Sequence, residues 1–147
     1  MTNLFETIFI VHYISTLIMT GAIWLAQLSQ YPLLVYVGRR NFIRYEHEHI
    51  NRISGVAWFI IYLELFTSII LLLINDNIVP SYFWVSGLFL IFLIWFATWS
   101  VQYPIHKKLE KGFDKTLHRK LVNSNWIRTI TWTLRSLMLT YILSILL

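Results

Sequence analysis

Four long apolar stretches, and the confinement of the basic residues to their edges, limit what this chain can fold into. The Lys and Arg residues lie in or beside two connections, one after the first stretch and one after the third, except for Arg135, which lies within the fourth stretch. A helix needs about 20 residues to cross about 30 Å of hydrocarbon. We therefore predict an all-α integral membrane four-helix bundle, a single transmembrane domain over residues 1–147, with spans near 4–32, 54–75, 82–104 and 126–147.

Composition excludes most soluble classes. The chain is 57% hydrophobic and only 13% charged, which leaves too few polar residues to cover a soluble globule. Its formal net charge of +5 comes from residues at the edges of the apolar stretches, where attraction to anionic lipid accounts for them. We expect the lipid bilayer as a partner and no nucleic acid, and the sequence leaves open whether the chain forms a homo-oligomer.

The basic residues also predict an orientation. Connections rich in Lys and Arg face the cytoplasm, so we expect a multi-pass protein of the inner (cytoplasmic) membrane with both termini outside. Residues 75–77 (Asn-Asp-Asn) with Pro80 are typical of a tight turn between the second and third spans. The two basic connections, over 38–53 and 105–125, mix charged with periodic apolar residues, and this pattern predicts short interfacial helices on the cytoplasmic side.

A weak internal repeat predicts two related hairpins. Residues 23–26 (IWLA) and 30–33 (QYPL) recur as 94–97 (IWFA) and 102–105 (QYPI). Each proline lacks a backbone N–H and clashes with the preceding turn, so we expect each to end or kink its span. The alternative is that Trp, Tyr and Gln recur because Trp and Tyr prefer membrane boundaries.

Three ionisable residues fall inside the spans, where charge costs at least about 2.5 to 3.5 kcal/mol. Glu64 and Arg135 lie at similar depths from the cytoplasmic ends of their spans, and His12 lies near the middle of the first span. We predict that Glu64 pairs with Arg135 and that all three meet in the bundle core. They are candidate catalytic or substrate-binding residues, and the alternative is a buried salt bridge that fixes helix register.

Candidate metal ligands gather near the cytoplasmic face. Glu46 and His49 are three residues apart on one helical face, the Glu-x-x-His spacing of metal sites in helical bundles, and His47 and His106 lie nearby in the same connections. Because the chain has no cysteine, a metal would be held by N and O ligands. The candidate cofactors are iron, copper or haem b, and the alternative is a solvated helix rich in charge.

Four further polar residues are candidates for orienting those ligands or binding a substrate or cofactor: Tyr31, Gln102, Asn125 and Arg128. Arg128 and Arg135 are seven residues apart and share a face of the fourth helix. One basic stripe therefore points into the bundle, where a carboxylate, a haem propionate or a lipid phosphate would suit it.

The C-terminal half resembles a known family. Residues 102–109 (QYPIHKKL) and 123–128 (NSNWIR), followed by Trp132 and Arg135, resemble an uncharacterised bacterial family of small four-span membrane proteins. They are also loosely similar to the anthrone-oxygenase-like family, whose members carry Pro-x-Asn-x-x-Leu after the third span and an Arg on the fourth. His106 stands where that pattern has Asn. The resemblance implies oxidative chemistry on a hydrophobic substrate.

Three functions remain open on the sequence. The first is a membrane-embedded oxidoreductase or oxygenase-like protein that binds a metal or haem through histidines and acts on a hydrophobic small molecule. The second is a small transporter or binding subunit that uses His12, Glu64 and Arg135 as its substrate site. The third is a structural accessory subunit whose polar core only fixes packing.

Overall fold

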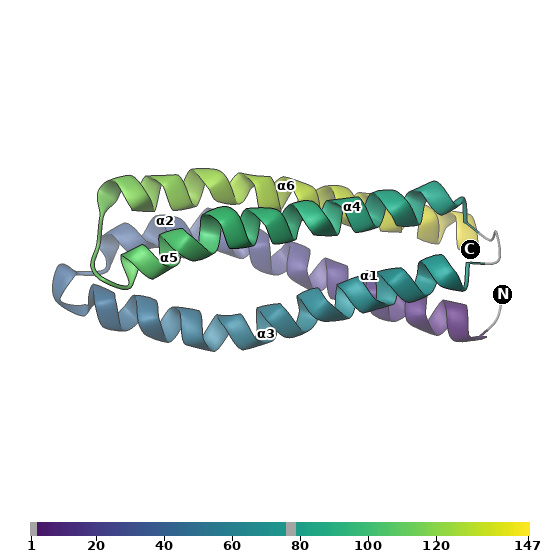
Figure 1. Cartoon of the computed structure of the whole chain (residues 1–147), viewed down its shortest axis with the longest axis horizontal. Helices are drawn as coiled ribbons and strands as arrows, with labels where there is room; N and C mark the ends of the chain where they lie inside the picture. Colours follow the sequence, from purple (N-terminus) through teal and green to yellow (C-terminus); the bar gives the residue numbers. More distant parts are fainter. Residues whose placement is uncertain (1–2, 76–78) are drawn as a thin grey trace.

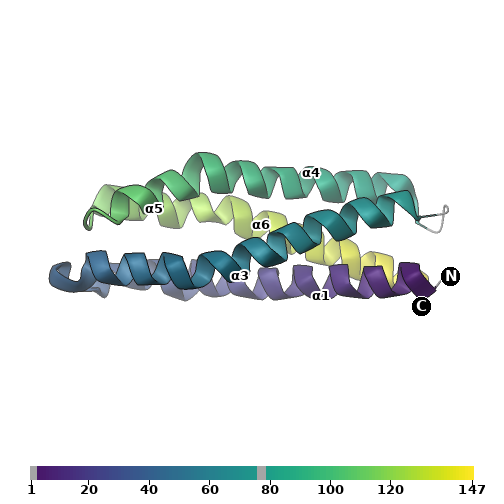
Figure 2. The ribbon, with the colours of Figure 1, turned by 60° about the horizontal axis from the view of Figure 1, so that its bottom comes forward.

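The computed structural model describes residues 3–75 and 79–147, and these form a bundle of long helical segments lying side by side (Figures 1 and 2). Four helical segments are long and apolar enough to cross a membrane: Leu4–Tyr36, Arg39–Leu73, Ser81–Leu109 and Lys115–Leu146. They overlap the four predicted spans. The all-α prediction is confirmed for the described residues, and the protein is a multi-pass membrane protein by the length and composition of its helices.

The first two segments contain several elements. The first is built from α1 (Asn3–Leu25), a π-helical turn η1 (Ala26–Gln30), α2 (Tyr31–Leu33) and a 3₁₀ turn η2 (Leu34–Tyr36). The second is the single helix α3 (Arg39–Leu73). We predicted a short separate helix in the connection before the second span, but residues 39–53 continue into that span without a break.

The last two segments repeat part of this order. The third is built from α4 (Ser81–Ala97), a second π-helical turn η3 (Thr98–Gln102) and α5 (Tyr103–Leu109). The fourth is α6 (Lys115–Leu146), which begins earlier than residue 126, where we placed its span. Asp114 caps its first turn, because the carboxylate Oδ1 accepts a hydrogen bond from the Leu117 N–H at 2.7 Å.

The helices occupy the corners of a bundle. α1 packs against α3 and α6, and α4 packs against the same two helices, so α3 and α6 stand at opposite corners. Both chain ends lie at one end of the bundle, and the α2–α3 and α5–α6 connections lie at the other (Figure 1). We call the latter the basic end, because most of the Lys and Arg residues belong to it.

We expected each proline to end or kink its span, and neither ends its helical segment. Pro32 and Pro104 each lie two residues after a π-helical turn, and the chain stays helical beyond both. A π turn bonds each N–H to the carbonyl five residues back, and such turns are one of the ways in which a helix accommodates an interrupted hydrogen-bond ladder. The prolines therefore coincide with a local change in winding rather than with an end.

Large apolar side chains cover the outside of the bundle. Phe59, Phe92 and Leu137 are 68%, 63% and 63% exposed, and many other Leu, Ile, Phe and Trp side chains are more than one-third exposed. In water such a surface would drive aggregation, whereas in hydrocarbon it is fully compatible with its solvent. The buried positions are accordingly where polar side chains concentrate.

Asn75 closes the connection between α3 and α4. Its Nδ2 donates to the Val79 carbonyl at 2.5 Å, and its Oδ1 accepts from the Val79 N–H at 3.1 Å and from the Trp84 indole at 3.0 Å. Of the predicted turn, Asp76 and Asn77 lie outside the described residues. Asn75 itself is buried, so its amide replaces the water that the Val79 backbone groups would otherwise need.

Asn75→Ala should lower the free energy of unfolding by about 2 to 3 kcal/mol, because it leaves three buried polar groups without partners. The change is measured by denaturant titration of the protein in detergent micelles. Asn123→Ala, at an exposed position of α6, is the matched control and should have little effect. Equal stability of the two variants would contradict the role of Asn75.

Candidate functional site

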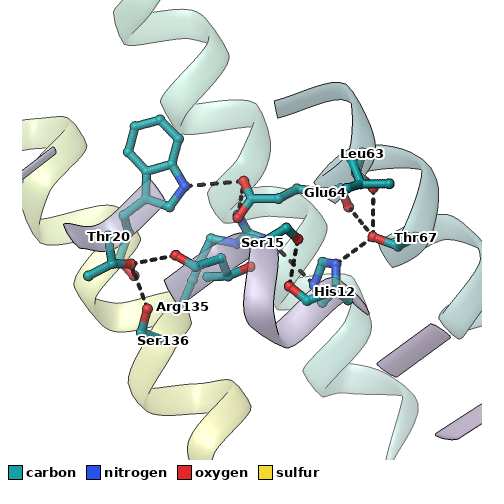
Figure 3. Close-up of polar contacts among 10 residues, drawn as sticks. His12, Ser15, Thr20, Leu63, Glu64, Thr67, Arg135 and Ser136 are labelled. Atoms are coloured by element: carbon teal, nitrogen blue, oxygen red, sulfur yellow. Dashed lines mark hydrogen bonds and ion pairs between the residues drawn. The ribbon is translucent and has the colours of Figure 1, made fainter. Parts of the chain in front are cut away.

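A polar cluster from α1, α3 and α6 fills the centre of the bundle (Figure 3). The Arg135 Nη1 donates to the Glu64 Oε2 at 2.9 Å, and both side chains are almost fully buried. The Trp132 indole donates to the same oxygen at 3.1 Å. The predicted pairing of Glu64 with Arg135 is confirmed, and it spans the diagonal between the helices at opposite corners.

His12 joins this cluster in a single tautomer. The Arg135 Nη2 lies 3.4 Å from the His12 Nε2, and because a guanidinium only donates, Nε2 must accept. The proton then sits on Nδ1, which donates to the Thr67 hydroxyl oxygen at 2.7 Å, and Thr67 donates to the Leu63 carbonyl at 2.6 Å. His12 is therefore a neutral link between Arg135 and α3 (Figure 3).

The cluster is nearly self-sufficient. Thr20 on α1 adds a hydroxyl contact of 2.6 Å to Ser136 on α6, so α1 is tied to both corner helices. Within the described chain, Glu64 Oε1 and Arg135 Nε are buried without a hydrogen-bond partner. The charges nevertheless cancel within the ion pair, which is what a low-dielectric interior demands.

Arg128 lies seven residues before Arg135 on the same face of α6, but it lacks a comparable partner. It is only 9% exposed, and among the described residues it makes no ion pair and no hydrogen bond. Its guanidinium carbon lies 5.6 Å from the centre of the Trp132 ring, a cation–π contact that compensates the charge only in part. A buried arginine without a counter-charge is rare, because unpaired charge is costly away from water.

The Arg128 side chain borders an apolar cavity of about 380 Å³ between α1 and α3. The walls are mostly alkyl side chains, and five polar or charged residues also line the cavity: Gln30, Tyr31, His49, Arg52 and Arg128. The apolar lining residues are Ile18, Met19, Ala22, Ile23, Ala26, Ile53, Val56, Ala57 and Ile60. We call this space the tail cavity, since its volume and chemistry are those of a site for a mainly apolar small molecule.

A second, smaller cavity lies on the other flank of α3. Its volume is about 100 Å³, and it borders Gln102, His106, Thr98 and Ser54. Tyr31, His49, Ile53, Ala57 and Arg128 line both spaces. We call this smaller space the polar chamber. Ile50, Trp58 and Ile61 supply apolar walls to the smaller space, and the Arg128 side chain stands at the junction of the two cavities.

A hydrogen-bonded chain borders the polar chamber. The His106 Nδ1 lies 2.6 Å from the Glu46 Oε1, and the His106 Nε2 lies 3.4 Å from the Tyr31 hydroxyl. His118 approaches the same region from α6, with its Nε2 2.8 Å from the Tyr31 carbonyl oxygen. Glu46 is fully buried, so this chain ties α3 to α5 and α2 at the basic end.

The predicted metal ligands only partly converge. Glu46 and His106 are in contact and His49 lines the adjoining chamber, but His47 points to the surface, 61% exposed, toward Asn51 and Glu110. No group of three His, Asp or Glu side chains in residues 3–75 and 79–147 is placed to hold a metal ion. The role of these four residues as metal ligands stays a prediction, and the geometry does not support it.

Haem b meets the same difficulty. Both ring nitrogens of His12 and of His106 have neighbours at 3.4 Å or less, and His118 uses its Nε2. Of the described histidines, only His49 and His106 line the tail cavity or the polar chamber, and of these two only His49 has no hydrogen bond to its ring. One available imidazole does not make a bis-histidine site, so the residues present do not fit the group.

The remaining predicted site residues separate into two sets. Tyr31, Gln102 and Arg128 line the polar chamber, whereas Asn125 lines neither cavity and donates instead to the Gln27 Oε1 at 2.9 Å. Sequence reasoning did not assign Thr67 or Trp132 to the site, although Thr67 lies three residues after Glu64 and Trp132 three residues before Arg135.

No family model, curated protein or solved structure matches this chain. The resemblance to the anthrone-oxygenase-like family therefore stays a prediction from the residues that carry it.

The ion pair predicts strong coupling between two substitutions. Glu64→Gln and Arg135→Gln should each lower the free energy of unfolding by about 3 to 5 kcal/mol, because each leaves the other charge buried alone. The double variant should lose clearly less than the sum of the two. Unfolding is followed in detergent micelles, with the exposed Glu6→Gln as control. Additive losses would show that the two side chains do not interact.

Proposed function

We propose that this protein binds a hydrophobic small molecule with an anionic head, with the apolar part in the tail cavity and the head beside Arg128. The observation that carries the proposal is the isolation of this arginine, which is nine-tenths buried with no carboxylate or hydrogen-bond acceptor in contact among the described residues. An anionic ligand would supply the missing counter-charge through charge-assisted hydrogen bonds.

The contrast within α6 supports this proposal over a general structural role for its arginines. Arg135 has Glu64 as its partner, whereas Arg128 has none in the part of the chain that is described. The two positions are seven residues apart, so they face the same side of the helix. The chain supplies a carboxylate for one and leaves an apolar cavity in front of the other.

The cavity walls favour an amphipathic ligand over a small free anion. The lining of α1 and α3 is alkyl over most of its length, and both helices carry exposed apolar side chains on their outer faces. A molecule dissolved in the bilayer would reach such a site from the lipid. This agrees with the hydrophobic substrate that the sequence predicts.

The orientation predicted from the charges completes this proposal. The basic end would face the cytoplasm, with both chain ends on the opposite side of the inner membrane. The helical segments of the basic end would lie at the level of the lipid headgroups and would act as the interfacial helices. Two related hairpins remain part of the proposal, supported by the π-helical turns that precede Tyr31 and Tyr103.

Two other functions from the sequence are weaker. A midplane substrate site at His12, Glu64 and Arg135 is not favoured, because these residues mostly satisfy one another and none of them lines the tail cavity or the polar chamber. A metal- or haem-dependent oxidation of the bound molecule stays a prediction, since the histidines do not converge. We therefore propose ligand binding and no chemical step.

Arg128→Gln should weaken the binding of parinaric acid, a fluorescent fatty acid, by roughly ten- to a hundredfold, because it removes a hydrogen bond to a charged group. Binding is measured by fluorescence in nanodiscs of phosphatidylcholine. The methyl ester of the same acid has no anionic head, so its affinity should be insensitive to the substitution.

Two further variants distinguish the contribution of the Arg128 charge from that of the volume of the tail cavity. Arg44→Gln, at an exposed position of α3, should leave the affinity for parinaric acid unchanged. Ala22→Leu fills part of the tail cavity and should weaken the acid and the ester alike. Equal binding of the acid to the unaltered protein and to Arg128→Gln would contradict the proposal.

A further inference from the structure

We infer that the polar chamber is a second subsite, which accepts a hydroxyl or amide N–H carried next to the anionic group of the ligand. The inference rests on the proposed function and narrows its ligand class. Gln102 is 1% exposed, and its Oε1 is buried without a hydrogen-bond partner among the described residues. Gln102 lines the polar chamber, which also borders Arg128.

The orientation of the Gln102 amide follows from its neighbour. The Gln102 Nε2 lies 2.8 Å from the Ser124 Oγ, and the Ser124 hydroxyl donates its proton to the Lys120 carbonyl at 2.6 Å. The serine oxygen can therefore only accept from Gln102, which places the NH₂ group on that side. The carbonyl oxygen of the amide is left as the group without a partner, and it requires a donor.

The size of the chamber limits that donor. At about 100 Å³ the chamber is much smaller than the tail cavity of about 380 Å³. It therefore suits a small polar group beside the carboxylate, such as a hydroxyl or an amide, rather than a second alkyl chain. Because Arg128 borders both spaces, the anion can lie at the junction while the chain extends into the tail cavity.

The chemistry of the two subsites together defines a class of ligand. The class is a single-chain amphiphile whose carboxylate carries a hydroxyl or an amide N–H on a nearby atom, such as a 2-hydroxy fatty acid. Arg128 recognises the anion and Gln102 recognises the donor. A simple fatty acid would leave the Gln102 Oε1 buried and unpaired, and this omission costs affinity.

The test compares three competitors against parinaric acid in phosphatidylcholine nanodiscs: hexadecanoate, 2-hydroxyhexadecanoate and 2-methoxyhexadecanoate. The methoxy compound has the oxygen but no proton to donate. We expect the hydroxy acid to bind roughly five- to a hundredfold more tightly than the other two. The Gln102→Met variant should abolish this preference while keeping its affinity for hexadecanoate.

Two further variants test whether the effect of Gln102→Met could instead come from a change in folding. Ser124→Ala removes the acceptor that holds the Gln102 amide, at a partly exposed position, and should reduce the preference for the hydroxy acid. Asn123→Leu removes an amide at an exposed position of α6 that lines neither cavity and should leave the preference intact. A nanodisc arm with phosphatidylglycerol tests a phospholipid source, and we expect no competition from it.

The outcomes are distinct. Equal affinities for the three acids, a preference that survives Gln102→Met, or displacement of parinaric acid by phosphatidylglycerol would overturn the inference. Each of these results leaves the proposed function standing if binding still depends on Arg128. Absence of binding by every acid would overturn the proposed function, and the inference with it.

Discussion

Neutralisation of buried charge is the constraint on which this bundle depends. Glu64 and Arg135 lie at opposite corners of the bundle, on α3 and α6, and their contact of 2.9 Å crosses its centre. Hydrocarbon provides no solvent for either group, so each is tolerable only because of the other. His12 extends the contact to α1 through hydrogen bonds in one tautomer. Helix register is thereby fixed by electrostatics, since the apolar faces alone gain little from packing in lipid.

The same constraint applies to Arg128, the other buried arginine of α6. Nothing in the described residues neutralises this arginine, yet it is held in place between a cavity of about 380 Å³ and one of about 100 Å³. An arginine with a purely structural role is expected to have a carboxylate partner, as Arg135 has in Glu64. The combination of an isolated cation, an unpaired Gln102 oxygen and an alkyl wall is the arrangement expected of a binding site for an amphipathic anion. Arg135 stabilises the bundle, and under the proposed function Arg128, about two turns away on the same helix, binds the ligand.

The sequence predicted the parts of this account that depend on composition and depth. Charged residues within apolar stretches stand out, and equal distances from the membrane edge were enough to pair Glu64 with Arg135. The directions of the side chains at the basic end were harder to predict. A π turn adds a residue to the winding, and one residue rotates a helical face by about 100°, so a regular period does not tell where His106 points. His47 and the two cavities also depend on how the helices pack, which no single helix encodes.

The most direct test of the central claim is a structure of the protein with a fatty acid brominated at its apolar end. The account predicts an anomalous bromine signal in the tail cavity, between α1 and α3, and the carboxylate within hydrogen-bond distance of the Arg128 guanidinium. Bromine elsewhere on the surface, with Arg128 paired to a carboxylate of the protein itself, would contradict it.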